Sequence, residues 1–202
     1  AYITNTTPTI EFQVKDTDSG VNAGTIAVTV DGTAVSTVTK TAINGGYKCT
    51  CTSPTLKDGS HTISVKASDN DGNAAAAKTA TFTVDTVPPT LQITAPSNNL
   101  ITNKKTVTVS GKTDDVSSKP VTVTVNGATV TVGTDGTFTK DVTLAEGANT
   151  ITIVAKDKAG KTTTVTRKVT VDTSAPVIKS VTLTPNPVDC GKTFIIAVEI
   201  TD

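Results

Sequence analysis

The side chains in this sequence that are best suited to chemistry are aspartates at the ends of strand-like runs. Asp85 closes a Thr/Val run, and Asp157 lies between two lysines shortly before a glycine. Asp114 and Asp115 stand side by side after a third run. Carboxylate oxygens are the ligands that Ca²⁺ prefers, so these four aspartates are the candidate metal ligands. Asp is also favoured in turns, where it bonds the local backbone, and that structural role is the alternative.

Two further residue types could support catalysis, but neither has the surroundings that catalysis needs. His61 is the single histidine, and it aligns with Asn149 in the internal repeat described below, so we expect an ordinary turn residue. No serine lies in a Gly-x-Ser-x-Gly turn, and no glycine-rich phosphate loop follows a strand. The Asp114-Asp115 pair lacks the aromatic cleft typical of glycosidases. We therefore predict that the chain is not an enzyme.

The three cysteines do not form a disulfide framework. Cys49 and Cys51 lie two residues apart on one predicted strand, hence on one face and about 6.5 to 7 Å apart, which is at or beyond the disulfide limit. We expect both to be buried or half-buried thiols. Cys190 has no evident local partner, and no further Cys or His lies at the spacing of a zinc site.

The elements that must position these residues are short strands with a period of two. Apolar residues alternate with polar ones over 10–14 and 121–125, and Asp31-Gly32 and Asn126-Gly127 provide hairpin turns. Thr, Val and Ile are abundant, as is typical of pleated, half-buried surfaces. Seven such strands in about 87 residues predict an all-β fold, a two-sheet Greek-key sandwich.

The sandwich is predicted to occur as a tandem repeat. Val84-Asp85-Thr86 returns as Val171-Asp172-Thr173, and the segment from Leu56 realigns at Leu144, an offset of 88 residues. The expected units are repeat 1 (1–86, first strand missing), repeat 2 (87–173) and the partial start of a third (174–202). Because the pattern begins and stops within a repeat, we interpret the chain as a slice of a longer protein built as a linear array.

These motifs resemble a known family. The relevant residues are Val125-Asn126-Gly127, Asp135 to Phe138, Glu146 to Ile151, Ala155 to Gly160 and Val171-Asp172. Together they are similar to bacterial immunoglobulin-like repeats of surface proteins, notably the accessory domains of glucodextranase-type enzymes. The resemblance implies an Ig-like sandwich. It does not imply an activity, because such sandwiches have many unrelated functions.

In a Greek-key sandwich the loops that carry the candidate ligands meet at the end where the chain enters the domain. We therefore expect Asp85, Asp114, Asp115 and Asp157 to gather there, so that Ca²⁺ would stiffen the joint between repeats 1 and 2. Repeat 1 has a comparable set: Asp16, Asp18, Asp69 and Asp71.

Charge and aromatic content restrict the partners. The 18 basic and 18 acidic residues cancel without a basic cluster, which argues against nucleic acid and anionic membranes, and no stretch approaches the roughly 20 apolar residues of a membrane span. The phenylalanines fall at inward positions, so Tyr2 and Tyr47 are the rings left to contact a ligand, with Tyr47 the candidate. We predict a structural spacer or stalk of an extracellular bacterial surface or secreted protein, such as an adhesin. The alternatives are an accessory module that binds polysaccharide or host protein, beside a glycoside hydrolase, and a decorating module of a phage particle.

The start of the third repeat should need a partner. Phe194, Ile196, Val198 and Ile200 form one apolar stripe, and an isolated pair of strands is marginally stable in water. We expect residues 174–202 to fold back on repeat 2 or to add a strand to another chain.

Overall fold

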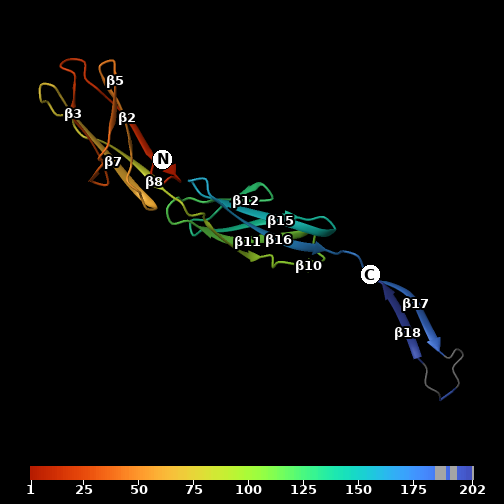
Figure 1. Ribbon diagram of the computed structural model, residues 1–202. Helices are drawn as coiled ribbons and strands as arrows, with labels where there is room; N and C mark the ends of the chain where they lie inside the picture. Colours follow the sequence, from red (N-terminus) through yellow and green to blue (C-terminus); the bar gives the residue numbers. More distant parts are fainter. Residues whose placement is uncertain (185–189, 192–194, 202) are drawn as a thin grey trace.

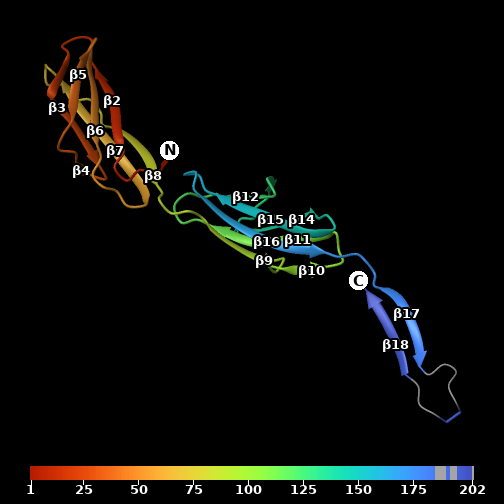
Figure 2. The same ribbon diagram turned by 45° about the vertical axis from the view of Figure 1, so that its right-hand side comes forward.

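The computed structural model describes residues 1–184, 190–191 and 195–201. These residues form strands, turns and loops, and none of them lies in a helix. Two β-sandwiches and a separate two-stranded hairpin follow one another along the chain (Figures 1 and 2). No helix in the described part of the chain is long and apolar enough to cross a membrane.

The first sandwich consists of two sheets with strand orders β1-β8-β7-β3-β4 and β2-β6-β5. Its strands are β1 Tyr2–Ile3, β2 Thr9–Lys15, β3 Val21–Val30, β4 Thr33–Ala34, β5 Thr39–Ile43, β6 Gly46–Thr52, β7 Gly59–Asp69 and β8 Lys78–Val84. The short β1 runs parallel to β8, while the other pairs are antiparallel. The Asp31-Gly32 hairpin turn joins β3 to β4, and both of its residues have positive φ.

The second sandwich repeats this plan with orders β10-β16-β15-β12-β13 and β14-β11-β9. Its strands are β9 Thr90–Ala95, β10 Leu100–Thr102, β11 Thr106–Asp114, β12 Thr122–Val125, β13 Ala128–Val130, β14 Thr137–Thr143, β15 Gly147–Lys156 and β16 Thr162–Val171. β10 is parallel to β16, as β1 is to β8. β9 pairs with β11, whereas β2 pairs only with β6 within residues 1–84, so the first sandwich has no equivalent of β9.

The alternation of Val and Ile with Thr explains the sandwich cores. In β12, Val123 and Val125 are buried while Thr122 is exposed. Ile151 and Ile153 of the neighbouring strand β15 belong to the same core. Phe138 and Leu144 complete this core. At about 25 cal/mol for each Å² of apolar surface removed from water, such burial is the main stabilising term of each sandwich.

The first sandwich has two apolar clusters, and Phe12 packs against both of them. Cys51 lies in the cluster with Ile10 and Phe82, and Cys49 in the cluster with Val21 and Ala67. Both thiols are free and buried, as the sequence predicted, and burial raises the pKa of each. The cysteines of β6 therefore serve as small apolar core residues.

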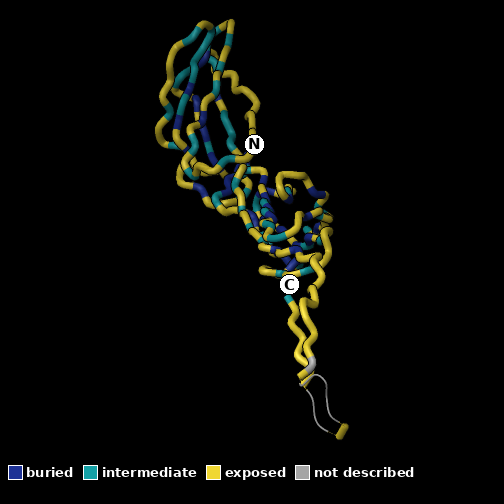
Figure 3. Tube along the Cα trace, turned by 90° about the vertical axis from the view of Figure 1, so that its right-hand side faces the viewer, coloured by how far each residue is buried: buried dark blue, intermediate teal, exposed yellow. Residues whose placement is uncertain are grey.

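The hairpin consists of β17 Val177–Thr184 and β18 Ile195–Thr201. Ile178 pairs with Ile200 and Val181 with Val198, so both strands contribute to one apolar face. Val198 is 49% exposed and Ile200 57%, and the hairpin stands apart from the sandwiches (Figures 1 and 3). It does not fold back on the second sandwich, so strand addition to another chain stays a prediction; Phe194 lies outside the described residues.

Candidate metal centre

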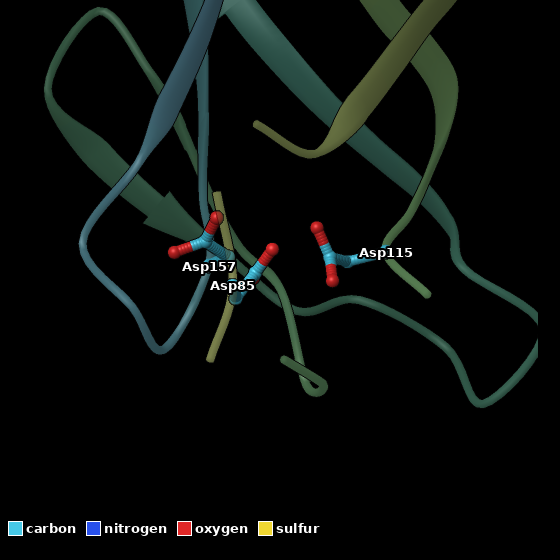
Figure 4. Close-up of side chains that lie close together, drawn as sticks. All are labelled: Asp85, Asp115 and Asp157. Carbon is cyan, nitrogen blue, oxygen red and sulfur yellow. The ribbon is translucent and has the colours of Figure 1, made fainter. Parts of the chain in front are cut away.

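Three of the four candidate ligands come together at the start of the second sandwich. Asp85, Asp115 and Asp157 each place one carboxylate oxygen within 4.8 Å of the others. Their exposed fractions are 1%, 5% and 5%, so all three carboxylates are buried. Figure 4 shows the three side chains close together, with those of Asp85 and Asp115 facing one another. We call this group the aspartate cluster.

Asp85 is positioned by the first residues of the linker. It follows β8 directly, and its backbone N–H donates to the Ile3 carbonyl at 2.9 Å. Its Oδ1 accepts from the Val87 N–H at 3.2 Å, and its Oδ2 accepts from the hydroxyl of Ser118. These contacts hold the Asp85 carboxylate in the end of the second sandwich rather than in solvent.

Asp115 is oriented by the loop that follows β11. Its Oδ1 accepts from the backbone N–H groups of Ser117 at 2.8 Å and Ser118 at 2.7 Å. Ser118, which is fully buried, thus joins Asp115 to Asp85. Sequence reasoning missed Ser118. The signal was the serine pair two and three residues after an aspartate, a spacing at which aspartate commonly accepts backbone hydrogen bonds.

Asp157 occupies the turn between β15 and β16. Its Oδ1 accepts from the Lys161 N–H at 2.9 Å, which fixes the side chain against the turn. Its Oδ2 is buried and has no hydrogen-bond partner among the described residues. Buried polar atoms are rarely left in this state, because the lost hydration is not replaced.

Asp114, the fourth candidate, does not join the cluster. Neighbouring residues of a strand point to opposite faces, so Asp114 at the end of β11 points outward when Asp115 points inward. Its Oδ1 lies 2.7 Å from the Lys119 ammonium, and the hydrogen bond from Lys119 lowers the pKa of Asp114. Asp114 is an exposed ion-pair residue.

The first sandwich does not repeat the cluster. Among the described residues, only the group at Asp85 has metal-ligand spacing. Asp69 occupies the position of Asp157, but Asn73 donates to both of its oxygens, through its backbone N–H and its side-chain amide, each at 2.8 Å. Asp16 accepts from the Gly20 N–H at 2.7 Å. Asp69 and Asp16 are therefore satisfied by local hydrogen bonds.

The cluster concentrates negative charge without a cationic side chain. The ion pairs of the described residues are Lys48–Glu11, His61–Asp31 and Lys119–Asp114, and none involves Asp85, Asp115 or Asp157. Like charges brought together in a poorly solvated site repel strongly, and an uncompensated buried carboxylate is costly. A bound cation is the simplest countercharge for this arrangement.

A hollow of about 380 Å³ gives solvent access to the cluster. Asp58 of the first sandwich lines it together with the linker residues Val87 and Pro88. Asp85 and Asp115 form part of its wall, so an ion entering the hollow would meet these two carboxylates.

His61 is not a turn residue, contrary to our expectation. It lies on β7 and is 9% exposed, with its ring against Phe82 at a centroid distance of 5.6 Å. Its Nε2 donates to the Lys57 carbonyl at 2.8 Å, and its Nδ1 lies 2.6 Å from Asp31 Oδ2. The imidazole ties a loop and a hairpin to the strand, which a short sequence alignment to Asn149 could not reveal.

Tyr47, the candidate ligand contact, lies on β6 and is half-buried. Its ring packs against the cluster of Val21, Ile26, Cys49 and Ala67. Part of the ring therefore serves the core of the first sandwich, and the exposed remainder is what a ligand could reach.

Comparison with known families agrees with this architecture. Residues 1–86 match the model of the family described as Bacterial Ig-like domain, and residues 89–173 match that of Glucodextranase, domain B. Residues 1–173 are tandem bacterial immunoglobulin-like repeats. The boundary between the two matches falls in the linker that carries Asp85, so the aspartate cluster combines residues from both repeats' matched regions.

One curated relative and several solved structures are similar to parts of this chain. Bacillopeptidase F from Bacillus subtilis (strain 168) is 35% identical over 123 residues, which are 61% of this chain and 8% of that protein. The chain therefore spans a small part of this relative. A titin fragment with three Ig domains is similar with a TM-score of 0.52 at 12% identity, covering 89% of this chain and 64% of the fragment. The fibronectin(III)-like modules of Clostridium thermocellum CbhA have a TM-score of 0.48 at 18% identity, covering 85% of this chain and 88% of that structure. The titin likeness shows the fold alone.

Proposed function

We propose that these Ig-like repeats are non-catalytic spacer modules of an extracellular bacterial protein, displayed on the surface or secreted. The observation that carries this proposal is that both linkers are fixed by the same contacts. After the first sandwich, Thr86 donates its N–H and its hydroxyl to the Asp58 carboxylate at 3.0 and 2.9 Å. After the second, Thr173 donates the same two groups to Glu146 at 2.8 and 2.7 Å. We call these two contacts the linker clamps.

A fixed linker is what a spacer needs. A flexible joint allows the modules to collapse on one another, whereas a joint held by hydrogen bonds keeps them extended. Most large apolar side chains of the two sandwiches pack in the cores, and those that the sandwiches expose are Tyr2, Ile101 and Val116, which leaves little apolar surface for a ligand. The relatives that bear enzyme names support a place beside a catalytic domain, and a host that is an adhesin would use the same spacer property.

Small-angle X-ray scattering tests the spacer proposal. We expect the chain to have a radius of gyration well above the about 16 Å of a compact chain of this length. A variant with a Gly-Ser insertion between Thr86 and Val87 is the matched control and should give a broader distribution of dimensions. Equal, compact dimensions for both proteins would contradict a spacer.

A binding assay separates the spacer from an accessory binding module. We expect no specific retention on bacterial polysaccharides or on a glycan array. Specific binding that Tyr47→Ala abolishes, while Tyr47→Phe retains it, would instead support the accessory module, because the ring rather than the hydroxyl is what stacks on a sugar.

A further inference from the structure

We propose that the aspartate cluster binds one Ca²⁺ ion, and that this ion locks the linker between the two repeats to the second sandwich. The proposal goes beyond the spacer role, since a spacer could function with or without a cation at its joint. It assigns a ligand to Asp85, Asp115 and Asp157 and makes the stiffness of the joint depend on calcium.

Two independent observations point to a ligand. The first is the spacing: three buried carboxylates lie within 4.8 Å of one another with no cationic side chain paired to them in the described chain. The second is Asp157 Oδ2, an unpartnered oxygen on a side chain only 5% exposed. Asp69, at the same position of the first repeat, has both oxygens satisfied by Asn73. The orphan oxygen is thus specific to the site where the other carboxylates gather.

The donor set and its spacing fit calcium. Ca²⁺ binds oxygen at about 2.3 to 2.6 Å, so two oxygens on one ion lie at most about 5.2 Å apart, and the three carboxylate oxygens lie within 4.8 Å of one another. Ca²⁺ accepts irregular coordination completed by water, whereas Mg²⁺ demands a nearly ideal octahedron, so three carboxylates from three separate loops suit Ca²⁺ better.

The ion would join parts of the chain that are otherwise held separately. Asp85 belongs to the linker, Asp115 to the loop after β11 and Asp157 to the turn between β15 and β16. Without a cation, repulsion among the three carboxylates opposes the hydrogen bonds that hold Asp85 in the second sandwich. With Ca²⁺ bound, all three carboxylates are attracted to one ion, so the linker is held more firmly.

Calorimetric titration of Ca²⁺ into the EDTA-treated 202-residue chain tests the proposal. We expect one ion per chain with a dissociation constant of about 0.1 to 1 mM, the range of extracellular calcium modules. In 5 mM Ca²⁺ the melting temperature of the second sandwich should rise by about 4 to 18 °C, depending on the dissociation constant within this range. Asp157→Asn should weaken binding at least tenfold.

The chain offers a matched control in Asp172. It occupies the position of Asp85 in the next linker, and its N–H donates to the Thr102 carbonyl as that of Asp85 does to Ile3, yet it is exposed. Asp172→Asn should bind Ca²⁺ like the unchanged chain. Equal loss of binding in both variants would overturn the assignment to this cluster, as would the absence of both heat and a melting shift in the unchanged chain.

A crossover in stability separates a metal site from a merely structural cluster. In EDTA, Asp157→Asn removes one of three repelling charges and should melt higher than the unchanged chain. In 5 mM Ca²⁺ it should melt lower, because the unchanged chain gains the ion. A variant that melts lower in both conditions would show that Asp157 is needed for folding alone. Scattering from the unchanged chain in both conditions tests the spacer separately, because an extended chain that ignores Ca²⁺ refutes only the ion.

Discussion

At the scale of single residues, His61 and Asn149 hold equivalent loops of the two repeats with different side-chain groups. Both lie near the start of the strand that follows an acidic loop, 88 residues apart. His61 donates to the Lys57 carbonyl, and Asn149 donates to the Ala145 carbonyl at 2.8 Å while accepting from the Ala145 N–H at 3.0 Å. The position therefore needs a donor toward the preceding loop, and only the histidine adds a charge that depends on pH.

That charge makes the stability of the first repeat depend on pH. Burial disfavours the charged imidazole, but the hydrogen bonds to Asp31 and Lys57 outweigh it and raise the pKa of His61. The hydrogen bond from His61 lowers the pKa of Asp31. A raised histidine pKa contributes stability below the unfolded value near 6.5 that is lost as the pH rises through the folded value. The lowered Asp31 pKa contributes stability above its unfolded value of about 3.8. The pair therefore stabilises the fold most between about pH 3.8 and pH 6.5.

His61→Asn should expose this window. We expect the variant to fold, since Asn149 fills the equivalent position, and to lose about 1 kcal/mol of unfolding free energy at pH 5.5. At pH 8.5 the loss should be close to zero because the neutral imidazole can donate only one hydrogen bond. Urea unfolding at both pH values measures the difference. A loss that is the same at both would mean that the ring acts by packing on Phe82 rather than by charge.

At the scale of elements, β11 shows how closely the strands of the second sandwich approach. A Cβ on Gly111 would lie 2.5 Å from the Gln92 carbonyl oxygen and 2.8 Å from Cζ of Phe138. Gly111 pairs with both Ile93 and Phe138, beside a shift of register. The strand thus needs glycine for space, a requirement imposed by two neighbours that are distant in sequence.

Gly111→Ala should destabilise the second repeat by about 1 to 3 kcal/mol, the usual cost of overpacking. Lys112→Ala is the control, because Lys112 lies next on the same strand and is exposed. Thermal unfolding followed by calorimetry measures both. Equal stability of the two variants would mean that β9 and β14 shift apart at no cost.

The linker clamps are the second feature at this scale. Each joins an acidic side chain of a loop to the threonine that follows the repeated Val-Asp pair, and the hydrogen bonds from Thr173 lower the pKa of Glu146. A carboxylate whose pKa is lowered on folding contributes stability above its unfolded pKa, near 4.5. That stability is lost as the pH falls through the folded pKa, so the second clamp weakens in acid.

Thr86→Val keeps the shape of the side chain and removes the hydroxyl donor to Asp58. We expect faster amide hydrogen exchange at Thr86 and Val87, by about two- to tenfold, with little change in the melting temperature of either sandwich. Thr79→Val is the control, since Thr79 is an exposed residue of β8 away from the linker. Unchanged exchange in both variants would show that β1 alone fixes the joint.

At the scale of the whole molecule, the hairpin differs from the rest of the chain. The sandwiches bury their apolar faces between two sheets, whereas β17 and β18 expose theirs (Figure 3). An exposed apolar strand pair with open edges is a template for pairing with another chain.

Removal of residues 174–202 should therefore change association but not folding. We expect the full chain to self-associate at high concentration and the shortened chain to stay monomeric, with the same melting temperatures for both sandwiches. Sedimentation velocity over a concentration series measures this, and Ile200→Lys in the full chain is a milder variant that should have the same effect. A full chain that remains monomeric throughout would contradict strand addition between copies.

The sequence was sufficient to predict the all-β class, the tandem Ig-like repeats, the missing counterpart of β9 and the buried thiols of Cys49 and Cys51. These features follow from local rules: period-two alternation, hairpin turns and an offset of 88 residues are written along the chain. The division into units at residues 86 and 173 remains a prediction of the same kind.

Which aspartates meet depends on the fold in three dimensions. Asp114 and Asp115 are neighbours in sequence, but their side chains point to opposite faces at the end of β11. Asp114 therefore pairs with Lys119, and Asp115 lies near Asp85. The role of Ser118, the burial of His61 and the orphan oxygen of Asp157 likewise depend on loops that approach one another across the end of a sandwich. The physical reason is that hydrogen bonding and burial depend on distance in space, and at loop ends the sequence does not specify that distance.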